Sequence, residues 1–402
     1  MGRQAPRKRE VPCRTSNRVR SSWSRPADVN HIQPEKAGDK RLLPFRSASY
    51  SLQTSMHPTS PELAEKAQAP VIGIIASAST ILCHNVHSID GRTAMASTLL
   101  GKTLVIANPK ARSGLAVAAI DYAKSFFAAH AGLTEACDFY MTKAIGDATV
   151  RCADASDFDT VVALGGDGII HEVANGLMQI DRASRPALAI IPFGSGNDIA
   201  RTWGVPFNDA EKALAHLASS AKHTIDVGRV NDEFFLETLS FGLDAAIALD
   251  TTDKRASGTI EKGEQLYVTS GIKYMASGSK GYACTFSLDG GPAQHIRSLI
   301  FAIQNGPTYG GGFRVCPKAD PADGKLDICY NVKNPAIPVL LALFGLARFG
   351  KHAGSSAVAF ARASHIEIEY EDPSVPCQAD GERVEGSRFV VDLLPAELDI
   401  YR

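Results

Sequence analysis

One aspartate stands among glycines in the stretch VVALGGDGIIHEVANG, which covers residues 161–176. Gly165, Gly166 and Gly168 permit backbone conformations that other residues avoid, and they let a ligand approach the main chain closely. The loop follows an apolar run typical of a buried strand and precedes a helical pattern, whose first N–H groups attract phosphate. A carboxylate does not itself favour phosphate, so Asp167 indicates work with Mg²⁺, a water or a hydroxyl proton.

Two further loops of similar character strengthen this interpretation. Gly194-Ser195-Gly196-Asn197-Asp198 follows another apolar run, and the segment ANPKARSG (107–114) follows an earlier one. Because open α/β sheets bind ligands outside the carboxyl ends of their strands, we expect the loops to converge at one sheet edge. A single G-G-D-G loop is also found as an ordinary strand-to-helix turn, but the repetition favours a phosphate site.

Other nucleotide and metal signatures are absent from the sequence. It has no G-x-x-x-x-G-K-[ST] motif, no G-x-G-x-x-G fingerprint, and neither the H-R-D nor the D-F-G signature of protein kinases. The eight cysteines are scattered without C-x-x-C spacing, which indicates neither zinc nor disulfides and fits a reducing cytoplasm.

The elements around the loops predict the fold class. Between about residues 103 and 226, apolar strands alternate with amphipathic helices, which is typical of a parallel sheet covered on both faces. Beyond a boundary at 226–232 the chain has short runs rich in Phe, Ile, Val and Tyr, which predict an antiparallel sandwich or barrel. The only clearly helical stretch in that part is 336–352.

The first 98 residues differ from the rest of the chain. Residues 1–47 hold 12 lysines and arginines against 4 acidic residues, whereas the remainder holds 30 against 39. Few apolar positions recur, so we predict a disordered basic extension over 1–98. Such a run attracts anionic lipid or nucleic acid, although a solvated tail is the simpler interpretation, and Met95 offers an alternative start.

Five motifs in order reveal a resemblance over residues 102–402: NPKARSG, GGDGIIHEVANGL, PFGSGNDIAR, NGPTYGGGFRVCPKADPADGKLDI and QADGE. The chain resembles the diacylglycerol kinase catalytic-domain family, in particular bacterial lipid kinases related to sphingosine and ceramide kinases. The resemblance implies an α/β domain over 99–228, similar to phosphofructokinases and NAD kinases. It also implies a β-sandwich over 229–402, with ATP bound in the cleft between the two domains.

The resemblance also assigns residues that contact the nucleotide, by their position in the motifs. They are Asn108, Pro109, Ser113, Gly114, Thr142, Gly165, Gly166, Asp167, Gly168, Ile169, Ile170, His171, Ser195, Gly196 and Asn197. Ile169 departs from the family pattern, in which threonine follows G-G-D-G. We expect the change to be tolerated because the backbone N–H groups remain, although it leaves room for a weakened kinase.

Metal and catalytic groups follow from the same resemblance. Asp320, Asp323 and Lys325 match the family's Mg²⁺ loop, with a carboxylate from Asp323 and backbone oxygens from the other two. By itself Pro-Ala-Asp-Gly is an ordinary turn sequence. Glu382 is implied as the proton acceptor, with Asp167 as the weaker candidate, and Asp380 belongs to the same catalytic D-G-E.

The expected function is an ATP-dependent lipid kinase that phosphorylates a lipid hydroxyl, with diacylglycerol giving phosphatidic acid as the first choice. Alternatives are a NAD kinase-like enzyme and a nucleotide- or lipid-binding regulatory protein with weakened catalysis. We expect a cytoplasmic protein in peripheral contact with the inner face of the membrane and no nucleic-acid partner, and a homodimer stays open. The helix at 336–352 lies against the bilayer or packs in the core.

Overall fold

The computed structural model describes residues 98–256, 264–276 and 280–402. Except for Thr98, the predicted basic extension lies outside the described residues. Everything below concerns the compact unit that begins at Arg92.

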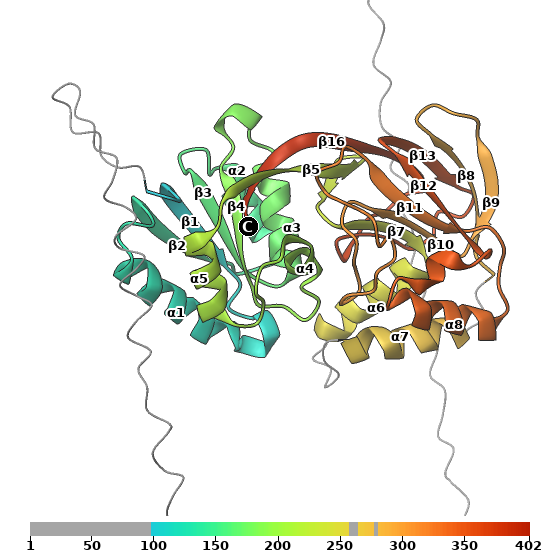
Figure 1. Ribbon diagram of the computed structural model, residues 1–402, viewed down its shortest axis with the longest axis horizontal. Coiled ribbons are helices and arrows are strands. Elements are labelled where there is room, and N and C mark those ends of the chain that lie inside the picture. Colours follow the sequence, from blue (N-terminus) through green and yellow to red (C-terminus); the bar gives the residue numbers. More distant parts are fainter. Residues whose placement is uncertain (1–97, 257–263, 277–279) are drawn as a thin grey trace, which may run out of the picture. The chain divides into compact units, whose positions relative to one another are not determined.

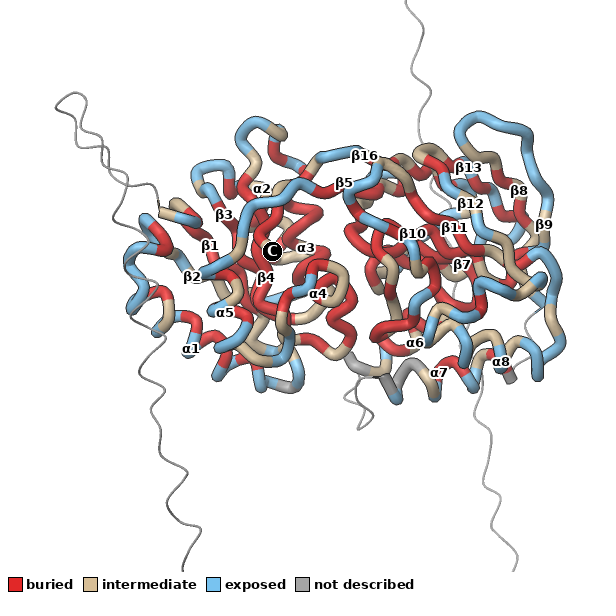
Figure 2. The backbone as a smooth tube through the Cα atoms, in the orientation of Figure 1, coloured by how far each residue is buried: buried red, intermediate tan, exposed pale blue. Residues whose placement is uncertain are grey.

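A parallel sheet with the strand order β2-β1-β3-β4 forms the centre of the first domain (Figure 1). Every residue of β3 and β4 is buried, so these strands appear as continuous red segments in Figure 2. Strands with both faces covered are typical of this class, and the predicted α/β fold is confirmed. The four strands are β1 (Lys102–Ala107), β2 (Ala136–Met141), β3 (Thr160–Gly165) and β4 (Ala187–Pro192).

Helices cover both faces of this sheet and produce two hydrophobic cores. One core includes Ile170 and Val173, and the other includes Ile120 and Leu214. The helices on the first face are α2 (Asp147–Ala153), α3 (Asp167–Leu177) and α4 (Asp198–Trp203), and those on the second are α1 (Ala116–Ala129) and α5 (Ala210–Ser219).

The second domain is an antiparallel β-sandwich, as the sequence predicts. One sheet has the order β12-β11-β10-β7-β14-β15, and a second layer is made by β16, β13, β8 and β9. Phe241, Phe301 and Phe389 lie in the apolar core that the two layers share. The strands are β7 (Thr238–Gly242), β8 (Tyr282–Leu288), β9 (Gln294–Ser298), β10 (Ile300–Gln304), β11 (Leu326–Asn331), β12 (Val358–Ala363), β13 (His365–Tyr370), β14 (Cys377–Ala379) and β15 (Glu382–Arg383).

The last strand, β16 (Arg388–Tyr401), belongs to both domains. Its first residues pair with β13, most of its length from Val391 to Tyr401 pairs with β5 (Lys222–Val230), and Ile400 pairs with β4. β5 in turn pairs with the short β6 (Glu233–Phe235). The C-terminal strand therefore completes the sheet of the first domain, which a division into consecutive residue ranges does not anticipate (Figure 1).

Two helices of the second domain were not predicted. The sequence predicts a strand for the run EFFLETLSFGLDAAIA and a helix only for 336–352. The prediction of a single helix is wrong, because α6 (Leu243–Ala256) and α7 (Glu264–Ala276) are also helical. Gly242 ends β7 with a φ of 87°, and a Cβ atom there would lie 2.5 Å from the oxygen of Leu299. This glycine turns the chain from strand into helix. The predicted helix at 336–352 is α8 (Ile337–Ala347), followed by a 3₁₀ turn.

Within the described residues, no helix is both long and apolar enough to cross a membrane.

Candidate active site

The two predicted glycine loops meet backbone to backbone at the carboxyl ends of β3 and β4. A Cβ atom on Gly194 would lie 2.7 Å from Cα of Gly166, and one on Gly166 would lie 3.2 Å from Cα of Gly194. Any side chain at either position would push the loops apart. Gly165 has a φ of 152° and ends β3 directly before them. The expected convergence of the two loops is therefore present in the structure.

Asp167 is tied to the second loop rather than left alone. Its Oδ2 accepts a hydrogen bond of 2.7 Å from the backbone N–H of Asn197. Asn197 has a left-handed φ of 56°, and its side chain bonds both N–H and C=O of Gly194. These bonds fix the Asp167 carboxylate at the start of α3, where the first N–H groups of the helix have no partner within the helix. An anion placed there faces both a fixed carboxylate and the N–H groups at the helix N-terminus.

The first predicted segment reaches the same sheet edge. Asn108 follows β1, its side chain closes a turn on Lys110, and its Cβ lies 3.5 Å from a Cβ atom built on Gly165. Thr142 follows β2 and bonds the C=O of Ala107 through its backbone N–H. Asn108, Thr142 and the glycine loops are thus neighbours, as expected from the strand order. Their contact with a nucleotide stays a prediction, as does that of Pro109, Ser113, Gly114, Ile170, Ser195 and Gly196.

Ile169, the departure from the family pattern, points into the core. Its side chain is 6% exposed and packs in the apolar cluster beneath α3. Its Cγ2 lies 2.8 Å from the position of a Cβ atom on Gly165, so the methyl occupies space that this glycine leaves open. The residue is therefore a packing group beneath the loop, whereas its backbone N–H remains available in the first turn of α3.

Glu382 approaches the first glycine loop from the second domain. This loop, residues 165–171, is the predicted phosphate loop. A Cβ atom on Gly168 would lie 3.2 Å from Oε1 of Glu382. Burial raises the pKa of the Glu382 carboxyl, nearby carboxylates add to this rise, and the charge of His171 opposes it. A carboxylate with a raised pKa beside a loop that is predicted to bind phosphate is suited to accepting a proton. The sequence-predicted residues Asp167 and Glu382 are thus brought to one place.

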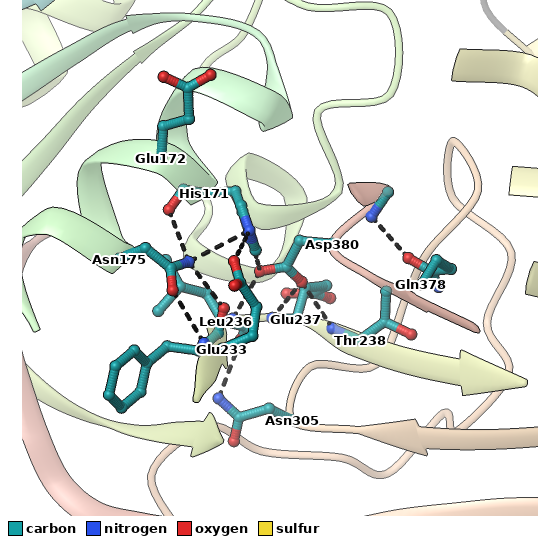
Figure 3. Close-up of polar contacts among 12 residues, drawn as sticks. His171, Glu172, Asn175, Glu233, Leu236, Glu237, Thr238, Asn305, Gln378 and Asp380 are labelled. Atoms are coloured by element: carbon teal, nitrogen blue, oxygen red, sulfur yellow. Dashed lines mark hydrogen bonds and ion pairs between the residues drawn. The ribbon is translucent and has the colours of Figure 1, made fainter. Parts of the chain in front are cut away.

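Asp380 is a hub of backbone hydrogen bonds (Figure 3). Its two oxygens accept N–H groups of Leu236, Glu237 and Thr238 at 2.7, 3.0 and 2.9 Å, and it is 8% exposed. Its φ of 49° lies in the left-handed region, where aspartate is tolerated better than most residues. Because its acceptors are occupied by the backbone, the geometry favours a role in shaping the turn over one in the reaction.

His171 lies between the two domains and not towards the glycine loops. Its Nε2 donates to Glu233 at 2.9 Å, and its Nδ1 lies 3.5 Å from Asp380. Burial lowers the pKa of His171, but the hydrogen bonds to both carboxylates outweigh it and raise the pKa to about 10. The side chain is therefore a buried imidazolium with both nitrogens engaged. Only its backbone remains for the predicted nucleotide contact.

Three residues that join the domains at this site are not among the contact residues predicted from the sequence. Asn175 joins α3 to β6, because its side chain donates to the C=O of Phe234 and accepts from its N–H, both at 2.9 Å. Asp198 stands in the quoted motif PFGSGNDIAR, and its Oδ2 accepts the N–H of Gly311 at 2.7 Å. Both residues reach across to the second domain, which only the three-dimensional structure shows.

The third residue, Glu237, is a buried carboxyl directly before β7. It is 2% exposed, and its Oε1 accepts the hydroxyl of Thr202 at 2.6 Å. Oε2 has no hydrogen-bond partner among the described residues. Burial raises the pKa of Glu237 well above its usual value, although the hydrogen bond from Thr202 opposes this rise.

The predicted magnesium loop holds its one predicted carboxylate ligand, Asp323, in an ion pair. The guanidinium of Arg362 binds Oδ2 of Asp323, while Oδ1 accepts the N–H of Lys325 at 3.1 Å. The Lys325 ammonium pairs with Asp289 at 3.0 Å, and Asp320 only caps its own turn. The described part of the chain contains no cluster of three metal-ligating side chains. The Mg²⁺ contacts expected of the Asp323 carboxylate and of the backbone oxygens of Asp320 and Lys325 stay a prediction.

Comparisons with known proteins identify the family. The diacylglycerol kinase catalytic domain matches residues 102–230, and the YegS C-terminal NAD kinase beta sandwich-like domain matches 237–402. A diacylglycerol kinase of Mycobacterium tuberculosis is 30% identical over 75% of this chain and 96% of its own. A probable lipid kinase YegS-like of Pseudomonas aeruginosa is 30% identical over 64% of this chain and 81% of its own.

Solved structures agree with this match. The crystal structure of a diacylglycerol kinase from Bacillus anthracis superimposes with a TM-score of 0.62 and 26% identity, over 76% of this chain and 98% of the other. A kinase family implies ATP as the phosphoryl donor. The chain belongs to the family of diacylglycerol kinases and YegS-like lipid kinases, and it is a kinase.

Proposed function

We propose that this kinase transfers the γ-phosphoryl group of ATP to the free hydroxyl of diacylglycerol, which yields phosphatidic acid. The proximity of Glu382 to Gly168 is the observation that supports it most. It brings a half-buried carboxylate from the second domain to the loop where phosphates bind. The printed names of the relatives, diacylglycerol kinase and lipid kinase, support the acceptor class.

The roles in this reaction follow from the site. The N–H groups at the start of α3 and in the second glycine loop hold the phosphates and stabilise the charge of the transition state. Glu382 accepts the proton of the lipid hydroxyl as its oxygen attacks phosphorus in line with the departing ADP. Asp167, fixed by Asn197, orients the reacting groups. Little other chemistry is required of the protein.

An apolar pocket in the second domain supports a lipid acceptor. It has an empty volume of about 920 Å³, part of which is open to solvent. Its polar lining includes the pair Asp244 and Tyr309, joined by a hydrogen bond of 2.8 Å. Burial of acyl chains in such a pocket is favourable by roughly 0.8 kcal/mol per methylene group. Its apolar lining includes Ile247, Met275, Leu299, Leu340 and Phe344.

Helix α8 supports contact with a bilayer. Leu340, Leu343 and Phe344 line the pocket, whereas other apolar side chains of the same segment are exposed, and no residue of the helix is buried. One helix thus faces the acyl pocket and presents apolar side chains outwards, which suits an enzyme that takes its substrate from a membrane surface. The exposed apolar side chains are Ile337, Val339, Leu341, Leu346 and Phe349.

The proposed acceptor is tested by incubating the protein with labelled ATP and vesicles that contain diacylglycerol, phosphatidylglycerol, a long-chain base or a polyprenol. A parallel reaction contains NAD. Mass spectrometry should find phosphatidic acid as the main product. Transfer mainly to another lipid would replace diacylglycerol as the acceptor, and transfer to NAD would contradict a lipid kinase.

A further inference from the structure

We infer that His171 is a positioning residue for Glu382, because it holds the turn Asp380–Glu382 of the second domain against the phosphate-loop helix of the first. The inference rests on the proposed role of Glu382 as the proton acceptor. His171 lies one turn after Asp167 on α3. Loss of its contacts with the second domain would therefore change the position of Glu382 relative to the phosphate loop.

The contacts of His171 cross from the first domain to the second. The residue is 3% exposed, and Figure 3 shows its ring between the carboxylates of Asp380 and Glu233. The distances are 3.5 Å from Nδ1 to Asp380 and 2.9 Å from Nε2 to Glu233. The Asp380 side chain is itself buried, so loss of the imidazolium would leave a buried carboxylate without its cation. The two hydrogen bonds between Asn175 and Phe234 also join α3 to β6, without involving His171.

The turn that His171 contacts is held by several hydrogen bonds. The position of Asp380 therefore determines the position of Glu382. Asp380 accepts the three backbone N–H groups already described, and Gln378 accepts the N–H of Gly381 at 2.6 Å. Ala379 pairs with Glu382 in the β14–β15 ladder. Asp380 and Glu382 are therefore parts of one hydrogen-bonded unit that touches α3 through His171.

The charge of His171 also acts on Glu382. The titratable groups facing the imidazolium from the second domain are Asp380, Glu233 and Glu382, and Glu172 follows it on α3. Asn175 Nδ2 lies 3.2 Å from Nε2, but both are donors when the ring is charged, so this amide bonds the C=O of Phe234 instead. The positive charge lowers the pKa of Glu382 and helps keep the base ionised.

The experiment compares His171→Gln, His171→Lys and the control His365→Gln in the full-length protein. His365 is likewise paired with a carboxylate, Asp392 at 2.7 Å, but it lies in β13. His171→Gln should lower kcat about tenfold or more with KM for ATP within about twofold. The acid limb of the kcat–pH profile should move to higher pH, because the base loses a neighbouring cation.

His171→Lys keeps a positive charge between the carboxylates, so its acid limb should return towards the wild-type position. If His171→Gln does not fold, the kcat and the pH profile of His171→Lys are compared with those of the wild type instead. In a Glu382→Gln background, His171→Gln should lower the remaining rate no further, because both changes act on the same group. His365→Gln should leave kcat and the pH profile unchanged.

Other results separate this inference from the proposed function. If His171→Gln lowers only the melting temperature while kcat and the acid limb stay at wild-type values, the positioning role is wrong and Glu382 keeps its role. An equal loss of rate in the Glu382→Gln background would also overturn it. A wild-type rate for Glu382→Gln itself would instead remove the base, and this inference with it.

Discussion

Gly168 of the phosphate loop and Glu382 of the second domain lie so close that a methyl group on the glycine would stand 3.2 Å from the carboxylate oxygen. The two residues are 214 positions apart in the chain and come from different domains. The reaction proposed above depends on this proximity, because the phosphoryl group and the proton acceptor must meet at one point.

Gly168→Ala tests the spacing directly. The glycine has no left-handed φ, so alanine is compatible with its backbone and the new methyl acts only on Glu382. We expect kcat to fall about tenfold through displacement of the base, with little loss of thermal stability. The control is Gly132→Ala, where a Cβ atom meets nothing within 4 Å. Equal kcat values for the two variants would show that the spacing does not matter.

Asp167→Asn removes one charge and keeps an oxygen that can accept the N–H of Asn197. The loop should therefore fold as before while kcat falls by about 100-fold, since a fixed carboxylate at the reacting centre is lost. Steady-state kinetics and circular dichroism measure the two effects separately. Asp154→Asn, at the exposed end of α2, serves as the control. Wild-type turnover of Asp167→Asn would refute our interpretation of the loop.

Ile169→Thr asks whether the missing hydroxyl weakens the kinase. The side chain packs in the core at 6% exposure, so threonine there should cost about 1–2 kcal/mol of folding free energy and leave kcat near the wild-type value. Urea unfolding gives the first quantity and initial rates give the second. A marked gain in kcat would show instead that the isoleucine does weaken catalysis.

Glu237→Gln should alter the pH dependence of stability. The folded protein holds the pKa of Glu237 well above its unfolded value, so stability is full below the unfolded pKa and falls as the pH rises towards the folded one. Glutamine is neutral at every pH and keeps an acceptor for Thr202. Relative to wild type, the variant should gain melting temperature from pH 5 to pH 9. A constant difference would mean that Glu237 does not titrate in this way.

Much of the site could be predicted because it depends on local sequence. The convergence of the glycine loops follows from the parallel strand order, which the alternation of apolar runs and helical patterns indicates. The sandwich fold likewise follows from short aromatic and β-branched runs. The start of α6 was missed because Gly242 changes the backbone direction in the middle of an apolar run, and hydrophobic periodicity does not record such a change.

Contacts between the domains could not be predicted from one sequence. In the sequence alone, nothing distinguishes the polar residues of α3, of β6 and of the bend before β7 that meet in the fold. They are His171, Asn175, Glu233 and Glu237. The path of β16 back to the first sheet is also non-local, because Ile400 pairs with Leu188. Arg362, which binds the carboxylate predicted to hold magnesium, lies on β12, 39 residues after Asp323. Contacts between residues so far apart in the chain can be identified only from the folded structure and not from a sequence motif.

The most direct test of the account compares wild type with Glu382→Gln, using labelled ATP and diacylglycerol vesicles at saturating ATP. ATP binding should be retained in the variant because the phosphate loop is intact, whereas formation of phosphatidic acid should fall by about 100-fold or more. Wild-type phosphorylation of diacylglycerol by Glu382→Gln, or no transfer to diacylglycerol by the wild-type protein, would contradict it.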